Sequence, residues 1–185
     1  MERRQRKTRE AIFNAFTALL SEKDVNKITV GEIIERADIG RATFYAHFET
    51  KDFLLKALCE ELFCHIFDST QNGEHRHKHI FECDAPDSVF LHLFQHLKKN
   101  DNHISELLTS ENNHLFLEYF KTGLIGLIEN LPFESDSRDI PREFLINHVA
   151  ATFVETVRWW FGGKEKLSTE EIYKYFLRVL KISDI

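Results

Sequence analysis

Residues 29–51 read TVGEIIERADIGRATFYAHFETK and contain two short amphipathic segments around a turn. In the first segment, apolar side chains at positions 30, 33, 34 and 37 have the spacing that lines one face of a helix. Thr29 and Glu32 have the spacing of a capping box, which predicts that a helix begins here. Gly40 permits a positive φ in the turn, so that a second helix, Arg41–Phe48, can leave at a steep angle. The stretch therefore predicts a helix-turn-helix.

The helix expected at 41–48 divides its side chains between two faces, at about 100° per residue. Phe44 and Phe48 fall close together and point toward the other helices, whereas Ala42 and Ala46 lie at the centre of the opposite face. A face with small residues at its centre can enter a DNA major groove, which is about 12 Å wide, with its polar neighbours level with the phosphates. Those neighbours are Arg41, Thr43, Tyr45 and His47. The alternative is that the last two merely cover a small core.

Length and composition favour a helical protein with one domain of ordinary size or two small ones. The chain has 185 residues, 43% of them hydrophobic, and contains seven Gly and three Pro. Its periodicity is helical rather than alternating, so we expect an all-α fold. Uncharged runs such as 144–154 are far shorter than the roughly 20 residues that a membrane span needs. The charged N-terminus lacks an apolar signal core, and we expect a cytoplasmic protein.

The charge and the cysteines are unevenly distributed. The net charge of −6 divides into +2 over residues 1–56 and −8 over 57–185, with +4 concentrated in residues 1–9. This basic segment is either a frayed terminus or an arm that contacts phosphates, and its place beside a helix-turn-helix favours the arm. Cys59, Cys64 and Cys83 are odd in number and lack C-x-x-C spacing, which indicates reduced thiols.

A three-helix head and a helical body follow from the periodicity. A first helix at 8–21 has an apolar stripe that the two helices of the motif can cover. Thr50 is a suitable N-cap for a fourth helix that begins at Lys51 and connects the head to the body. We therefore expect a DNA-binding domain at 1–50 and a helical body at 51–185.

Four runs of residues resemble the TetR family of bacterial transcriptional regulators over about residues 8–58. These runs are Ile28–Val30, Ala37–Ile39, Thr43–Phe48 and Lys51–Leu55. The resemblance implies that the DNA backbone is held by Thr43, Tyr45, His47 and Lys51. It also implies that bases are read by Arg41, by Ala42 and from the start of the preceding helix, at Thr29. At Gly31 some members carry a long base-reading side chain, so readout here is expected to depend more on Arg41 and the basic arm.

The resemblance also implies that the body binds a small molecule, forms a homodimer and transmits ligand binding to the head through the fourth helix. The dimer would form through the last two helices, expected at 141–161, ended by Gly162-Gly163, and at 168–181, opened by a Ser168–Glu171 capping box. A pocket would be lined by Phe90, Phe94, Phe116, Phe120, Phe153 or Trp160, although these residues would serve equally as core. Gly123 and Gly126, inside a helix expected at 115–130, indicate either close packing of another element or room for a ligand.

The stretch 72–84, NGEHRHKHIFECD, is polar and rich in histidine. His75, His77, His79 and Cys83 have side chains that suit zinc, nickel or copper, but a solvated loop is the preferred interpretation. His92 and His96, spaced i, i+4, could complete such a site, but an ordinary amphipathic helix is the preferred explanation for them. No metal site and no cofactor are predicted.

Two classes of function remain to be weighed. The first is a dimeric DNA-binding regulator, expected to be a repressor that a small-molecule ligand releases from its operator, with a metal-responsive regulator of the same fold as the alternative. The second is a helical enzyme or carrier. The sequence contains no nucleophile–base motif, phosphate-binding glycine loop or H-E-x-x-H. We therefore expect a regulator and not an enzyme.

Overall fold

The computed structural model describes residues 3–72, 88–99, 104–109, 114–131, 140–163 and 166–180. Over these residues the regular structure is helical, which confirms the predicted all-α class. The elements are α1 (Arg3–Leu20), the 3₁₀ turn η1 (Val25–Lys27), α2 (Val30–Arg36), α3 (Arg41–His47), α4 (Lys51–Asn72), α5 (Val89–Lys99), α6 (Ile104–Thr109), α7 (His114–Glu129), α8 (Arg142–Gly162) and α9 (Thr169–Leu180).

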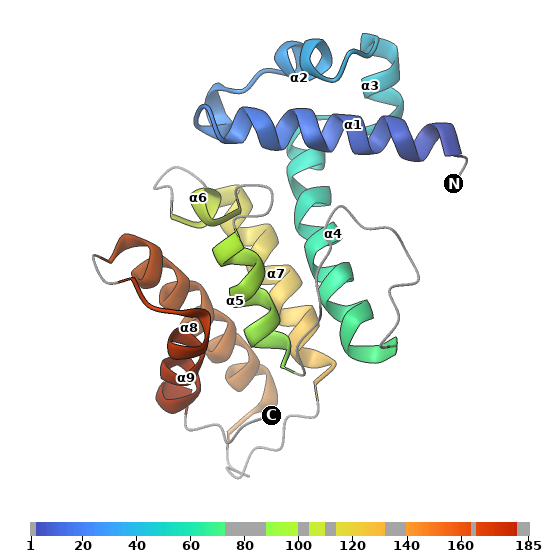
Figure 1. The fold of residues 1–185 in the computed structure, drawn as a ribbon. Helices are drawn as coiled ribbons and strands as arrows, with labels where there is room; N and C mark the ends of the chain where they lie inside the picture. The colour runs from blue at the N-terminus through green and yellow to red at the C-terminus, as the bar shows by residue number, and fades with distance from the viewer. Residues whose placement is uncertain are drawn as a thin grey trace.

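The first three helices form a head at one end of the molecule, and α2 and α3 lie on one side of α1 (Figure 1). The apolar stripes predicted from the sequence meet in its core, where Phe13, Phe16, Ile33, Phe44 and Phe48 are buried. The rings of Phe13 and Phe48 meet edge to face with their centroids 5.5 Å apart. The predicted three-helix head is therefore confirmed.

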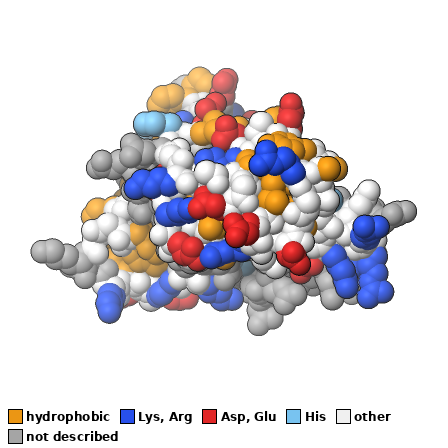
Figure 2. All heavy atoms as spheres, turned by 90° about the horizontal axis from the view of Figure 1, so that it is seen from above, with side chains coloured by type: hydrophobic (Ala, Val, Ile, Leu, Met, Phe, Trp, Pro, Cys, Tyr) orange, Lys and Arg blue, Asp and Glu red, His pale blue; other side chains and the backbone are white. Residues whose placement is uncertain are grey.

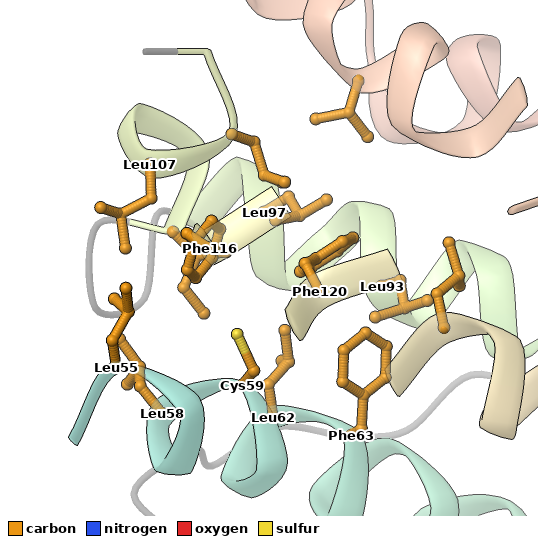
Figure 3. Close-up of a cluster of buried hydrophobic side chains, with 14 of the residues drawn as sticks. Leu55, Leu58, Cys59, Leu62, Phe63, Leu93, Leu97, Leu107, Phe116 and Phe120 are labelled. Carbon is orange, nitrogen blue, oxygen red and sulfur yellow. The ribbon is translucent and has the colours of Figure 1, made fainter. Parts of the chain in front are cut away.

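Helix α4 runs from beneath the head into the body (Figure 1). Its predicted N-cap is confirmed, because the Phe53 N–H donates to Thr50 Oγ1 at 3.2 Å. Further along α4, Leu58, Leu62 and Phe63 point toward the helices of the body (Figure 3). One continuous helix thus belongs to both parts, and the domain division at residue 50 stays a prediction.

The body consists of α5 to α9 and packs against α4 through α5 and α7. Helix α7 contacts both α4 and α8, and α5 contacts both α4 and α9. The capping box predicted for the last helix is confirmed, since Ser168 N–H donates to Glu171 Oε2 at 2.8 Å and Glu171 N–H donates to Ser168 Oγ at 3.1 Å.

Gly123 lies where α7 meets α4, and it favours one of the two explanations given for the glycines of α7. A Cβ added at this glycine would lie 2.3 Å from Cδ2 of the Phe63 ring, so close packing accounts for it. A Cβ added at Gly126 would meet no atom within 4 Å.

Within the described residues, no helix is long and apolar enough to cross a membrane.

Candidate nucleic-acid interface

Helix α3 has two different faces. Mostly small or polar side chains face the solvent, and aromatic side chains face the core. Phe44 and Phe48 are buried, as the helical angles predict. The exposed side chains are those of Arg41, Ala42, Thr43, Tyr45 and Ala46, and His47 is half-buried. Tyr45 is 50% exposed although it is aromatic, and its ring meets Phe44 edge to face with centroids 5.4 Å apart. The Tyr45 side chain is therefore accessible to solvent on the part of α3 that is predicted to contact DNA.

The orientation of α3 depends on a cluster that joins three helices of the molecule. The guanidinium carbon of Arg9, on α1, lies 4.9 Å from the centroid of the Phe13 ring and 5.0 Å from that of Phe48. The same guanidinium forms a 3.2 Å ion pair with Glu61, on α4. Arg9 thus holds the end of α3 against α1 and α4. Its positive charge is paired with Glu61 and with two aromatic rings of the same chain.

The turn before α3 differs from the sequence prediction. Gly40 is the N-cap of α3 with an extended backbone, φ −77°, so the prediction that it takes a positive φ is wrong. Asp38 takes the left-handed conformation instead, with φ 51°. Asp and Asn tolerate this region better than most residues because their short side chains bond to nearby backbone. The steep exit of α3 therefore begins two residues earlier than predicted.

The start of α2 is held by the predicted capping box together with a lysine. Thr29 N–H and Thr29 Oγ1 both donate to Glu32 Oε2 at 2.9 Å, and Glu32 N–H donates to Thr29 Oγ1 at 3.3 Å. Lys23 Nζ also donates to Glu32 and forms an ion pair with it. The bond from Lys23, followed by those from Thr29, lowers the pKa of Glu32 to about 2. The Thr29 hydroxyl therefore caps α2 in this structure.

Lys51 lies at the start of α4, but its ammonium group points back into the head. Its Nζ donates to the backbone oxygens of Val25 at 2.8 Å and Ile28 at 3.0 Å. These bonds tie α4 to the turn that leads into α2, and an ammonium has a third N–H to offer. A phosphate contact by Lys51 stays a prediction, and sequence reasoning missed the structural role.

The basic segment at the N-terminus is helical where it is described. Helix α1 begins at Arg3, five residues earlier than the predicted start at Thr8, so residues 3–9 form helical turns and not an extended arm. In the view onto the head, Lys and Arg side chains gather at the edge where α1 begins, while acidic side chains lie among basic ones in the middle (Figure 2). The positive charge of this face is therefore concentrated at one end.

Comparisons with known proteins agree with this geometry. The family model described as "Bacterial regulatory proteins, tetR family" matches residues 12–58, and the one described as "Transcriptional regulator C-terminal region" matches residues 84–181. A TetR transcriptional regulator from Streptococcus agalactiae 2603V, whose crystal structure is known, is 35% identical, and the match covers 96% of both chains with a TM-score of 0.71. This chain belongs to the TetR family. The resemblance noted in the sequence is confirmed.

Two curated relatives from Bacillus subtilis (strain 168) match shorter stretches. The HTH-type transcriptional regulator YxbF is 39% identical over 79 residues, and the HTH-type transcriptional regulator YvdT is 32% identical over 66 residues. The matches cover 40% and 36% of this chain, and they span 21% and 34% of the lengths of the two relatives. Family membership accordingly rests on the family models and the Streptococcus structure.

In this TetR-family body, the six residues predicted to line a ligand pocket are all buried and pack largely against one another. Phe94 lies 4.6 Å from Phe153 and 5.8 Å from Trp160, and Phe116 lies 6.0 Å from Phe120, all between ring centroids. Phe90 contacts Phe153 at 5.9 Å. A cavity of about 220 Å³ lies elsewhere, between α4 and α7, and its lining includes Lys56, Cys59, Phe63, Tyr119 and Gly123. A ligand pocket at the six residues stays a prediction.

The predicted metal-binding residues fall into two groups. His75, His77, His79 and Cys83 lie outside the described residues. His92 and His96 lie on α5, which is amphipathic as predicted, but both face the core. There they meet His65 of α4, and these three form the group of potential metal ligands found within the described residues. Sequence reasoning missed His65. His92 and His96 are four residues apart and can be recognised as a pair, whereas His65 is 27 residues away from His92 in the sequence.

Proposed function

We propose that this TetR-family chain binds double-stranded operator DNA with α3 in the major groove. The observation that carries the proposal is the division of α3 between the buried Phe44 and Phe48 and an exposed face centred on Ala42 and Ala46. Thr43, Tyr45 and His47 contact phosphates from the edges of that face. Arg41, exposed in the first turn of α3, reads a base edge, most naturally guanine O6 and N7, and Ala42 lies against the bases beside it.

Thr29 and Lys51 contribute through the helices that they hold. Because the Thr29 hydroxyl caps α2 and Lys51 Nζ donates to two carbonyls, both residues fix the position from which α3 is presented. The third N–H of Lys51 and the N-terminus of α4 then remain for a phosphate.

The DNA proposal is tested by fluorescence anisotropy with DNA from upstream of the protein's own gene. We expect Arg41→Ala to remove about 1–3 kcal/mol of discrimination at one base pair. Tyr45→Ala should weaken binding to all sequences by about 0.5–1.5 kcal/mol, as expected for one lost hydrogen bond to phosphate. Lys99→Ala, an exposed charge on α5, is the matched control and should change nothing. Binding that is insensitive to salt and equal in all three variants would contradict the proposal.

The chain acts as a homodimer joined through α8 and α9, because one short reading helix covers few base pairs and a two-fold dimer places two of them one helical turn apart. These two helices expose large apolar side chains that a monomer has no reason to expose: Phe144 is 62% exposed, Trp159 56% and Val179 71%. Between them lies an apolar groove of about 470 Å³, lined from both helices by residues that include Trp159, Ile172, Tyr175 and Val179. This exposed face supports the interface predicted at 141–161 and 168–181.

The dimer is tested by placing a charge on that face. Val179→Glu should shift the protein from dimer to monomer in analytical ultracentrifugation at micromolar concentration, because it buries an unpaired carboxylate. Lys174→Glu introduces the same group at an exposed position of α9 that does not line the groove, and this variant should remain dimeric. A monomeric wild-type protein, or a dimer that tolerates Val179→Glu, would contradict the interface.

We further propose that the protein is a repressor released from its operator by a ligand bound in the body. Helix α4 connects the two parts, so an altered packing of its distal half reaches Lys51 and the head as a rigid displacement. A catalytic activity is not proposed, since the family and fold are those of transcriptional regulators. A ligand that raises Tm without changing operator affinity would contradict a release mechanism.

A further inference from the structure

Three histidines meet in the core between α4 and α5. His65, His92 and His96 are 1%, 0% and 2% exposed. Their ring centroids lie 5.3 Å apart for His65 and His92, 4.8 Å for His65 and His96, and 4.9 Å for His92 and His96. The three rings therefore form a compact triangle, closed to solvent and built from two helices.

We infer that these three histidines bind one transition-metal ion. A potential ligand nitrogen from each residue lies within 4.8 Å of the other two. A tetrahedral zinc ion with bonds of about 2.0–2.1 Å holds its ligand nitrogens about 3.3 Å apart. His92 Nε2 and His96 Nε2 lie 3.2 Å apart and share a hydrogen bond. Their separation is already that of two ligands of such an ion, which would replace the shared proton.

The ligand set selects the class of metal. Imidazole nitrogen suits zinc, copper, nickel and cobalt, whereas magnesium and calcium prefer carboxylate and carbonyl oxygens. Three protein ligands leave the fourth position of a tetrahedral ion to water or another small ligand.

The apolar surroundings strengthen the inference. Leu62 and Ile66 flank His65 on α4, and Leu93 and Leu97 lie beside the other two on α5; all four are buried. An apolar shell limits the access of solvent to a metal site. An ion bound at the centre of the triangle bonds one nitrogen of each ring and joins α4 to α5.

The site lies on the helix that carries the head. His65 follows Lys51 by 14 residues on α4, about 21 Å along the helix axis. An ion that draws α4 toward α5 changes the packing of the distal half of α4, so metal binding alters operator affinity. This coupling rests on the proposed DNA-binding function, whereas the metal binding does not.

Metal binding is tested first, on full-length protein stripped with a chelator. Titration with Zn²⁺ against a chromophoric competitor should give one ion per chain, and Mg²⁺ should not compete. His92→Leu should weaken Zn²⁺ binding by more than about 100-fold, since losing only a residue that hydrogen-bonds to a metal ligand already costs about 10–100-fold. His96→Gln, which keeps a polar group, should show the same loss. Zn²⁺ should raise the Tm of the wild type and leave the Tm of both variants unchanged.

Two controls separate this site from the other histidines. His114→Leu changes an exposed histidine of α7, and the combined variant His75→Ala, His77→Ala, His79→Ala removes the histidines of the segment 73–87. Both should bind Zn²⁺ as the wild type does. If the wild type binds no more tightly than His92→Leu, or if the triple variant loses the binding instead, the inference is overturned.

Operator binding with and without Zn²⁺ completes the test. Zn²⁺ should change operator affinity at least about fivefold in the wild type, the low end for coupling between two sites, and should have no effect in His92→Leu. An unchanged affinity in metal-loaded wild type overturns the coupling. A protein that binds Zn²⁺ but no DNA in either state refutes the proposed function and not the metal site.

Discussion

The head and the body cover their apolar surface in different ways. The head buries its aromatic residues among its three helices and exposes one large aromatic side chain on α3, that of Tyr45, beside small and polar neighbours. The body buries most of its described phenylalanines among its own helices but leaves Phe144, Trp159 and Val179 exposed on α8 and α9. A surface for DNA needs polar groups at the height of the phosphates, and a surface for a second protein chain needs apolar area at its centre.

Each exposed face therefore has the chemistry of its proposed partner. The net charge has the same division, +2 over residues 1–56 and −8 over 57–185, so the body is repelled by the phosphates that attract the head. Electrostatics therefore favour an approach to DNA with the head foremost.

The largest effect is expected from removing the central aromatic residue of the head. Phe44→Ala should destabilise the head by about 3–5 kcal/mol, because Phe44 is buried and contacts Phe48 at 6.1 Å. Denaturant unfolding followed by circular dichroism measures this loss. Tyr45→Ala, one residue along, is the matched control: stability should stay within about 0.5 kcal/mol while DNA affinity falls. A large loss of stability in Tyr45→Ala would contradict the assignment of the two faces.

The joint between head and body is tested at Lys51. Lys51→Met keeps the aliphatic stem and removes the ammonium that bonds to Val25 and Ile28, so we expect a loss of about 1.5–3 kcal/mol in the free energy of unfolding. Lys56→Met, exposed on the next turn of α4, should change stability by less than about 0.5 kcal/mol. A loss of DNA affinity without any loss of stability would instead assign Lys51 to a phosphate.

The packing inside the body is tested by two glycines of one helix. Gly123→Ala should destabilise the protein by about 1 kcal/mol net. Overpacking against Phe63 costs about 1–3 kcal/mol, and the higher helix propensity of Ala offsets about 1 kcal/mol of that cost. Gly126→Ala has open space around its new Cβ and should stabilise by up to about 1 kcal/mol. Opposite signs in thermal unfolding support close packing at Gly123, and equal signs would contradict it.

The sequence predicted the features that depend on local spacing. The capping boxes at Thr29 and Ser168, the N-cap at Thr50 and the two faces of α3 follow from residues within one or two turns of each other. Periodicity also predicted the all-α class, because apolar side chains repeat along each helix.

The features that sequence reasoning missed depend on contacts between distant residues. Lys51 reaches a carbonyl 26 residues away, and His65 meets His92 and His96 only because α4 packs against α5. In the turn between α2 and α3, either Asp38 or Gly40 could take a positive φ. The general preference of Gly for that conformation predicted Gly40, but Asp38 adopts it. Packing and turn geometry, which no local spacing specifies, decided these cases.

The smallest effect concerns the cap of α2, which tests whether the head also depends on local electrostatics. The pKa of Glu32 is about 2 in the folded protein and 4.5 in the reference state, so its contribution is complete above pH 4.5 and is lost as pH falls toward 2. In Glu32→Gln the unfolding midpoint should fall less steeply over that range than in the wild type, because Gln keeps the capping spacing without a titrating group. Glu35→Gln, exposed on the same helix, should keep the wild-type slope. The comparison needs denaturant midpoints at about pH 5, 4 and 3. Equal slopes in wild type and Glu32→Gln would mean that the bonds from Lys23 and Thr29 do not hold this carboxylate in solution.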